Sequence, residues 1–236
     1  MKGIHLISGP RNISTALMYA FAHRSNCDVV DEPFYAYYLS KTHRAHPGAA
    51  EVINNMACNP DSVLNALHDA LRKTNELFVK NMPHHMLGID PILMRAFQPV
   101  FLIRHPSLMI ASFSKVIPNV SLIDLALKEQ VAMFEALKSV ARPIVLDAAT
   151  LLKDPATGMR RLCELLEIPF EESMLRWEPG PIKEDGPWAK YWYANVHASD
   201  GIRRRIEVPC NLDPKYSELL SEALPHYHHL KSFESI

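Results

Sequence analysis

Residues 4–17 read IHLISGPRNISTAL, and this stretch decides the fold. Its first four residues form an apolar run typical of a buried parallel strand, and residues 18–24 look helical. The turn between them holds the cation Arg11 and the hydroxyls of Ser14 and Thr15. Free backbone N–H groups and the positive end of the helix dipole suit such a turn to phosphate. The stretch predicts an anion site, although a capped turn without ligand fits the same residues.

The turn differs from the nucleotide-binding signature G-x-x-x-x-G-K-[ST]. Ile13 stands where a glycine is expected, and no Lys-Ser or Lys-Thr pair follows. These differences, together with the lack of a clear metal-binding aspartate, disfavour a nucleotide-dependent kinase or hydrolase.

Strand and helix patterns alternate along the rest of the chain. Further strands are expected at 100–103 and 144–146, with weaker candidates at 28–30 and 77–79. Helical patterns occupy 61–73, 122–137 (capped by Ser121), 155–166 (capped by Asp154) and 214–224. This alternation predicts a three-layer α/β/α fold with a mostly parallel central sheet. We expect a single domain over residues 1–236.

The composition limits the classes of partner. The 236 residues are 48% hydrophobic and 22% charged, with a net charge of −1, so the overall charge favours neither nucleic acid nor an anionic membrane. Four scattered cysteines, no signal peptide and no apolar run of membrane-spanning length lead us to expect a soluble cytoplasmic protein. The oligomeric state is not readable from the sequence.

A second candidate anion site follows another strand, where residues 101–112 read FLIRHPSLMIAS. Arg104 lies at the carboxyl end of the predicted strand, which is where α/β sheets bind ligands. Pro106 suits the first turn of a helix and places Ser112 nearly two turns into it. The alternative is that Arg104 simply pairs with a carboxylate.

Together these two segments resemble the sulfotransferases that use 3′-phosphoadenosine 5′-phosphosulfate (PAPS). The first is similar to the family's 5′-phosphosulfate loop, with Asn12 and Ile13 in place of the usual Ser-Gly. The second matches the 3′-phosphate motif, an Arg followed eight residues later by a Ser. A third segment, from Leu146 through LLKDP at 151–155 to IPF at 168–170, is similar to the family's "DLL-x-DP" region.

The resemblance implies a P-loop NTPase-like fold and a set of nucleotide-binding residues. On the 5′ side these would be Arg11, Asn12, Ile13, Ser14 and Thr15, with Arg11 also stabilising the transferring group. Arg104 and Ser112 would hold the 3′-phosphate. No metal is required, and the pairs His84-His85 and His228-His229 lack metal-binding spacing.

Two positions are candidates for the general base. Glu32 follows a predicted strand, at the place where bacterial relatives in the family often carry a catalytic carboxylate. His84 and His85 lie in KNMPHH at 80–85, which resembles the segment that carries a catalytic His in cytosolic sulfotransferases. A histidine with a near-neutral pKa would suit the task.

Residues 177–212 are rich in Pro, Gly, Trp and Tyr with little periodicity, and we expect a flap there. Trp188 or Tyr191 would stack on adenine and Arg203–Arg205 would reach phosphate, or else the aromatics pack the flap down and the arginines face solvent.

The expected function is sulfuryl transfer from PAPS to a hydroxyl, or less readily an amine, of a small-molecule acceptor. A nucleotide sensor or inactive homologue on the same scaffold is the alternative. The acceptor is not identified, because specificity in the family lies in variable regions such as residues 34–56.

Overall fold

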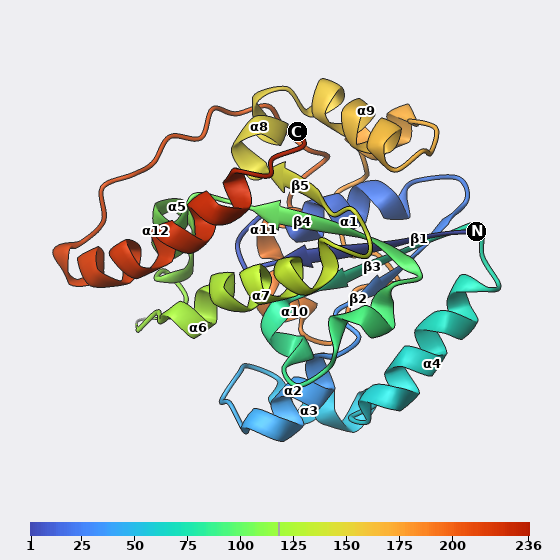
Figure 1. The fold of residues 1–236 in the computed structure, drawn as a ribbon, viewed down its shortest axis with the longest axis horizontal. Helices are drawn as coiled ribbons and strands as arrows, with labels where there is room; N and C mark the ends of the chain where they lie inside the picture. Colours follow the sequence, from blue (N-terminus) through green and yellow to red (C-terminus); the bar gives the residue numbers. More distant parts are fainter. Residues whose placement is uncertain (118) are drawn as a thin grey trace.

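The structure is a computed structural model that describes residues 1–117 and 119–236. Five strands form one parallel sheet in the order β2-β3-β1-β4-β5, with β1 at its centre (Figure 1). The strands are β1 (Lys2–Ser8), β2 (Cys27–Asp31), β3 (Glu76–Asn81), β4 (Phe97–Ile103) and β5 (Ile144–Asp147). All five expected strands are confirmed, including the two weaker candidates.

Helices cover both faces of this sheet, which makes the three layers (Figure 1). One face packs against α1 (Ser14–Ala22), α2 (Tyr35–Thr42), α3 (Ala49–Asn55), α8 (Ala148–Lys153) and α9 (Pro155–Leu165). The other packs against α4 (Pro60–Leu71), α7 (Leu127–Leu137) and α12 (Ser217–Lys231). The helices α5 (Pro106–Phe113) and α6 (Leu122–Leu125) belong to a third, smaller apolar cluster. The α/β fold class is confirmed.

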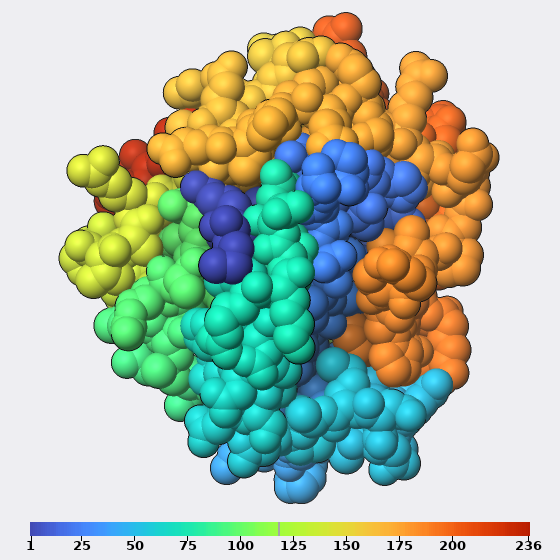
Figure 2. Space-filling model, turned by 90° about the vertical axis from the view of Figure 1, so that its right-hand side faces the viewer, coloured from blue at the N-terminus to red at the C-terminus, as the bar shows by residue number. Residues whose placement is uncertain are grey.

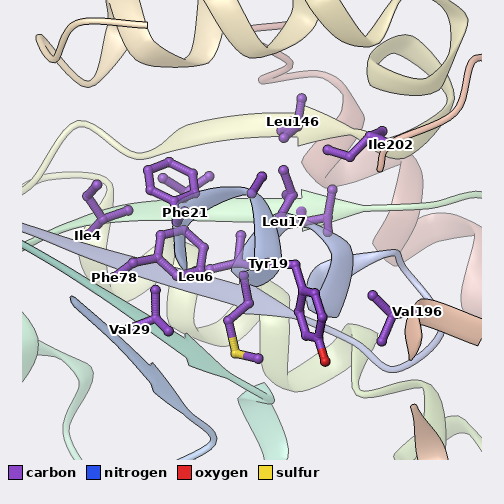
Figure 3. Packing of buried hydrophobic residues seen from close by; sticks show 14 of the residues in the cluster. Ile4, Leu6, Leu17, Tyr19, Phe21, Val29, Phe78, Leu146, Val196 and Ile202 are labelled. Carbon is purple, nitrogen blue, oxygen red and sulfur yellow. The ribbon is translucent and has the colours of Figure 1, made fainter. Parts of the chain in front are cut away.

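Side chains of successive strand residues alternate between the two apolar clusters, as the pleat of a strand requires. On the α1 face, Ile4 and Leu6 of β1 join Phe78 of β3, and Phe21 of α1 stacks on Phe78 with ring centroids 4.2 Å apart (Figure 3). Ile7 of β1 points to the other cluster. Both faces of the sheet are therefore dry, which explains why the strands are almost continuously apolar.

Two helical predictions need correction. The single helix expected at 122–137 is two helices, because Ala126 adopts a left-handed conformation with φ of 56° and breaks the turn. The helix expected at 214–224 begins with a 3-10 turn at Pro214–Tyr216 and continues as α12 through Pro225 to Lys231. The helix α12 continues beyond the proline because Tyr227 and Leu230 are buried there and complete the apolar core on that face of the sheet.

The segment 177–212, for which we predict a flap, contains only two short helices, α10 (Ala189–Trp192) and α11 (Ala194–His197). In Figure 2 its orange residues lie against the blue residues of α1 and the light-blue residues near α3. Lys190 pairs with Glu51 of α3 at 2.6 Å, and Val196 and Ile202 enter the apolar cluster around α1 (Figure 3). The part of this segment up to Ile202 is thus packed against the body of the molecule.

One buried polar side chain connects the two central strands near their carboxyl ends. The Nε2 of Gln130 in α7 donates to the carbonyls of Ile7 and Leu102, each at 2.9 Å. Gln130 is fully buried, so water cannot replace these hydrogen bonds. It therefore supports the point where β1 enters the anion turn.

We predict that Gln130→Met lowers the free energy of unfolding by about 1–3 kcal/mol, because two buried carbonyls lose a donor. Gln98→Met is the matched control, since Gln98 is only half-buried and its carbonyl partner Arg142 lies where water is available. Urea denaturation of both variants measures the difference. Equal stabilities for the two variants would contradict this account of Gln130.

Among the described residues, no helix combines the length and apolar character needed to cross a membrane.

Candidate functional site

A cavity of about 440 Å³ opens at the carboxyl ends of the strands. This is the edge at which parallel α/β sheets bind ligands. All ten residues predicted from the sequence to form the site line this cavity: Arg11, Asn12, Ile13, Ser14, Thr15, Glu32, His84, His85, Arg104 and Ser112. Segments far apart in the chain are therefore brought to one place.

The turn between β1 and α1 keeps an unusual backbone. Arg11 and Ile13 have φ angles of 65° and 60°, a left-handed conformation that favours glycine and that a β-branched residue adopts only against strain. Ile13 thus takes the backbone form of the glycine it replaces in the nucleotide-binding signature. Gly9 is required for another reason: a Cβ there would lie 2.4 Å from the carbonyl oxygen of Leu125.

Asn12 anchors the turn. Its side chain is fully buried, and its Nδ2 donates to the carbonyl of Leu102 in β4 at 3.3 Å. Beyond it, α1 starts at Ser14, so the free N–H groups of its first turn lie beside the cavity. The turn retains the elements of an anion site despite its departure from the usual sequence.

The two predicted anion motifs are hydrogen-bonded to each other across about 100 residues of sequence. Arg11 Nε donates to Ser112 Oγ at 2.9 Å, and Arg104 Nη1 donates to the Arg11 carbonyl at 2.5 Å. Burial and then the neighbouring Arg104 charge lower the pKa of Arg11. Two guanidinium groups this close create a strongly positive local potential, which favours the binding of an anion.

A carboxylate of the protein neutralises part of this positive charge. Arg104 forms a forked ion pair with Glu207, whose carboxylate also accepts from Arg205 Nε at 3.0 Å and Nη2 at 2.7 Å. The alternative reading of Arg104, that it pairs with a carboxylate, is therefore realised in the structure. Glu207 was not among the residues singled out from the sequence, where no pattern surrounds it.

A buried lysine organises the other end of the cavity. Lys80 of β3 is fully buried, and its Nζ lies 2.7 Å from Asp31 and 2.5 Å from Glu32. Burial alone would lower the pKa of Lys80, but the two carboxylates outweigh it and the pKa is raised. For Glu32, burial outweighs the attraction of Lys80 and raises the pKa.

Tyr193 completes this group from the segment 177–212. Its hydroxyl donates to Asp31 at 2.7 Å, and Lys80 Nζ and Trp188 Nε1 donate to it at 2.7 and 2.9 Å. The sequence pattern indicated Lys80 only as part of the segment 80–85. It did not distinguish Tyr193 from the other aromatic residues of the segment 177–212. Their pairing joins β3 to a segment 113 residues away, for which the sequence carries no signal.

The expectation that His84 and His85 have near-neutral pKa values is wrong. Both are buried, and desolvation lowers the pKa of His84 to about 3 and that of His85 well below its ordinary value. Their Nδ1 atoms have no hydrogen-bond partner among the described residues. His85 stacks on Tyr35 with centroids 4.5 Å apart, and its Nδ1 lies 3.6 Å from Glu32. The neutral imidazole of His85 therefore stands beside the Glu32 carboxylate.

The aromatic and basic residues of the predicted flap lie in different surroundings. Trp188 is 2% exposed and packs edge-on against Tyr35, although it still lines the cavity. Tyr191 is 45% exposed and its ring lies against Gly48, away from the cavity lining. Arg203 and Arg205 line the cavity.

Within residues 1–117 and 119–236, no group of three or more His, Cys, Asp or Glu side chains is arranged to hold a metal ion.

From the burial of His84 we predict that the free energy of unfolding depends on pH. His84 is neutral when folded but protonates when unfolded, because its folded pKa of about 3 lies below the ordinary 6.5. The unfolded state therefore binds more protons between these values, and the free energy of unfolding falls as the pH falls through this window. At pH 5 this group alone should contribute roughly 2 kcal/mol of destabilisation.

The free energy of unfolding should fall between pH 7 and pH 5 in the wild type. In His84→Asn we expect this fall to be smaller by about 2 kcal/mol. Chemical denaturation at both pH values measures this difference, and His228→Asn is the control because His228 is exposed. The same pH dependence in wild type and His84→Asn would show that the buried imidazole is not the origin.

Two sulfotransferases of known structure share the fold of this chain. The sulfotransferase domain from the curacin biosynthetic pathway superposes with a TM-score of 0.54 at 17% identity, covering 94% of this chain and 97% of that one. A sulfotransferase from Alicyclobacillus acidocaldarius gives a TM-score of 0.59 at 10% identity, covering 98% and 95%. At these identities the likeness is one of fold, and it places the chain in the P-loop-like sulfotransferase fold.

The sequence comparisons give the family. Two curated relatives are the branched-chain-amino-acid aminotransferase-like proteins 1 and 2 of Arabidopsis thaliana, 39% and 37% identical over 97% and 98% of this chain. The chain spans only 41% and 42% of their lengths, so their names describe much longer proteins. The sulfotransferase domain family matches residues 1–234. With this match over nearly its whole length, the chain belongs to the sulfotransferase domain family.

Proposed function

We propose that this domain binds PAPS and transfers its sulfuryl group to a hydroxyl, or less readily an amine, of a small-molecule acceptor. The observation that carries the proposal is the direct link between the two anion motifs. Arg11 donates a hydrogen bond to Ser112, and Arg104 donates one to the Arg11 carbonyl. Both motifs face the cavity that Glu32 also lines. A nucleotide with phosphate groups on both its 5′ and 3′ sides matches such a paired site.

In this proposal each part of the cavity has one task. The amides at the start of α1, with Arg11, Ser14 and Thr15, hold the 5′-phosphosulfate, while Arg104 and Ser112 hold the 3′-phosphate. The acceptor oxygen attacks sulfur, the bond from sulfur to the 5′-phosphate oxygen breaks, and adenosine 3′,5′-bisphosphate leaves. Arg11 and the amides stabilise the charge that develops on the leaving phosphate. Positioning and electrostatics therefore supply most of the catalysis.

The acceptor's proton would go to Glu32. Its raised pKa brings a carboxylate closer to the range that suits a general base at neutral pH, and its side chain reaches the cavity. His84 and His85 are less suited, because burial has made both of them weak bases. Lys80 acts as a positioning residue that holds Glu32 beside Asp31.

A non-catalytic nucleotide sensor on this scaffold is the second reading, motivated by the strained Ile13 in the turn. Acceptor-dependent release of adenosine 3′,5′-bisphosphate separates enzyme from sensor.

The nucleotide site should discriminate by the 3′-phosphate. We expect adenosine 3′,5′-bisphosphate to bind more tightly than AMP, and Arg104→Ala to remove most of that preference. Losing a charge-assisted contact to phosphate should weaken the bisphosphate by roughly 1.5–3 kcal/mol. Isothermal calorimetry with both nucleotides measures the preference, and equal binding by the wild type would overturn the assignment of the 3′ site.

The base should be Glu32. We expect Glu32→Gln to lower turnover by about 10²–10⁴-fold, because the substitution keeps the shape and removes the proton acceptor. Bisphosphate affinity and the melting temperature should change little, since Lys80 retains Asp31 as a partner. The assay measures bisphosphate release with an acceptor found by screening hydroxyl compounds.

His84→Asn and His85→Asn are the matched comparisons and should have mild effects on turnover. An inactive histidine variant together with an active Glu32→Gln would move the base to the segment 80–85. The pH profile is an independent check, because the loss of activity at low pH should disappear with the true base.

A further inference from the structure

Glu207 points inward from a strap that is mostly exposed to solvent. The strap, residues 203–213, contains no helix or strand. Ile206 and Val208 on either side of Glu207 are 76% and 65% exposed, yet the Glu207 side chain is only 4% exposed. An acidic side chain that turns inward while its apolar neighbours stay in water must be held by a specific partner.

That partner is the arginine of the proposed 3′-phosphate site. Glu207 accepts from Nε of Arg104 at 2.8 Å and from its Nη2, while the remaining Nη1 donates to the Arg11 carbonyl. The two parallel hydrogen bonds form the fork by which a guanidinium also binds phosphate. A phosphate oxygen pair and the Glu207 carboxylate would therefore use the same two donors.

The surrounding charges favour an exchange of one anion for another. Two arginines, Arg104 and Arg205, pair with the single carboxylate of Glu207, and the positive charge of Arg11 lies close enough to Arg104 to lower the pKa of Arg11. A 3′-phosphate carries more charge than a carboxylate and offers three acceptor oxygens. Such a phosphate can replace Glu207 on Arg104 and leave Glu207 paired with Arg205.

The strap is attached in a way that permits this exchange. Its backbone is held by Arg205 N–H on the Leu152 carbonyl at 2.8 Å and by Cys210 N–H on Ser107 Oγ at 3.1 Å. Between these two anchors, the backbone of residues 206–209 makes no hydrogen bond to the described part of the chain. The inward position of Glu207 therefore depends on its side-chain ion pairs.

We propose that Glu207 is an intramolecular competitor for the 3′-phosphate of the nucleotide, and so sets the affinity of the 3′ site. This inference rests on the proposed function, because it takes Arg104 as a phosphate ligand. Each bound 3′-phosphate must displace Glu207, and Glu207 in turn assists departure of the bisphosphate product. A nucleotide without a 3′-phosphate does not compete with it.

The test compares wild type, Glu207→Gln and Glu207→Ala by calorimetry with adenosine 3′,5′-bisphosphate and AMP. We expect both variants to bind the bisphosphate roughly 10- to 100-fold more tightly, because a charge-assisted competitor is removed, and to bind AMP about as the wild type does. Glu222→Gln removes the same charge from an exposed site on α12 and should change neither affinity. In an Arg104→Ala background, Glu207→Gln should have no effect.

The opposite result has a definite meaning. If the wild type prefers the bisphosphate over AMP and the Glu207 variants bind it equally or more weakly, Glu207 only holds Arg104 in place and the competitor role is wrong. If the wild type does not distinguish bisphosphate from AMP, the 3′-phosphate site itself is wrong and the proposed function fails with it. Melting temperatures of the variants establish that each one is folded.

Discussion

The neutralisation of Lys80 is the interaction on which the site depends. An ammonium group buried on a strand next to the centre of the sheet is strongly unfavourable unless carboxylates surround it. Asp31 and Glu32, at the end of the neighbouring strand β2, supply those charges, and the Tyr193 hydroxyl supplies a further polar partner. Glu32 is thereby held in a dry environment that raises its pKa, and the segment 177–212 is tied to the sheet.

A second constraint is the separation of charge along the cavity. Arginines gather at the end formed by the β1–α1 turn and the start of α5, whereas the carboxylate group around Lys80 lies toward α2. Such an arrangement orients a ligand that is anionic at one end and carries a proton to be removed at the other. Glu207 is the exception, since it brings a negative charge into the basic end. Its carboxylate occupies two of the guanidinium donors that a phosphate would use.

The strained turn shows how a sequence motif can change while its backbone persists. Ile13 and Arg11 both adopt left-handed conformations, which are costly for residues with a Cβ. Asn12 is held to β4, and Gly9 leaves room for the chain around Leu125, so the surrounding structure imposes the conformation. Backbone strain of this kind is found mostly at functional sites, which agrees with an anion-binding role.

The sequence by itself determined the α/β class and all five strands, and its resemblance to the sulfotransferases pointed to the ten residues that line the cavity. It could do so because buried strands are continuously apolar, and because motifs that follow parallel strands in an α/β fold share one edge of the sheet. Local pattern could not show that Ala126 breaks a helix, that burial makes His84 a weak base, or that Tyr193 bonds to Asp31. Nor could it show that Glu207 pairs with Arg104. These features depend on desolvation and on contacts between distant segments, and only the tertiary structure decides both.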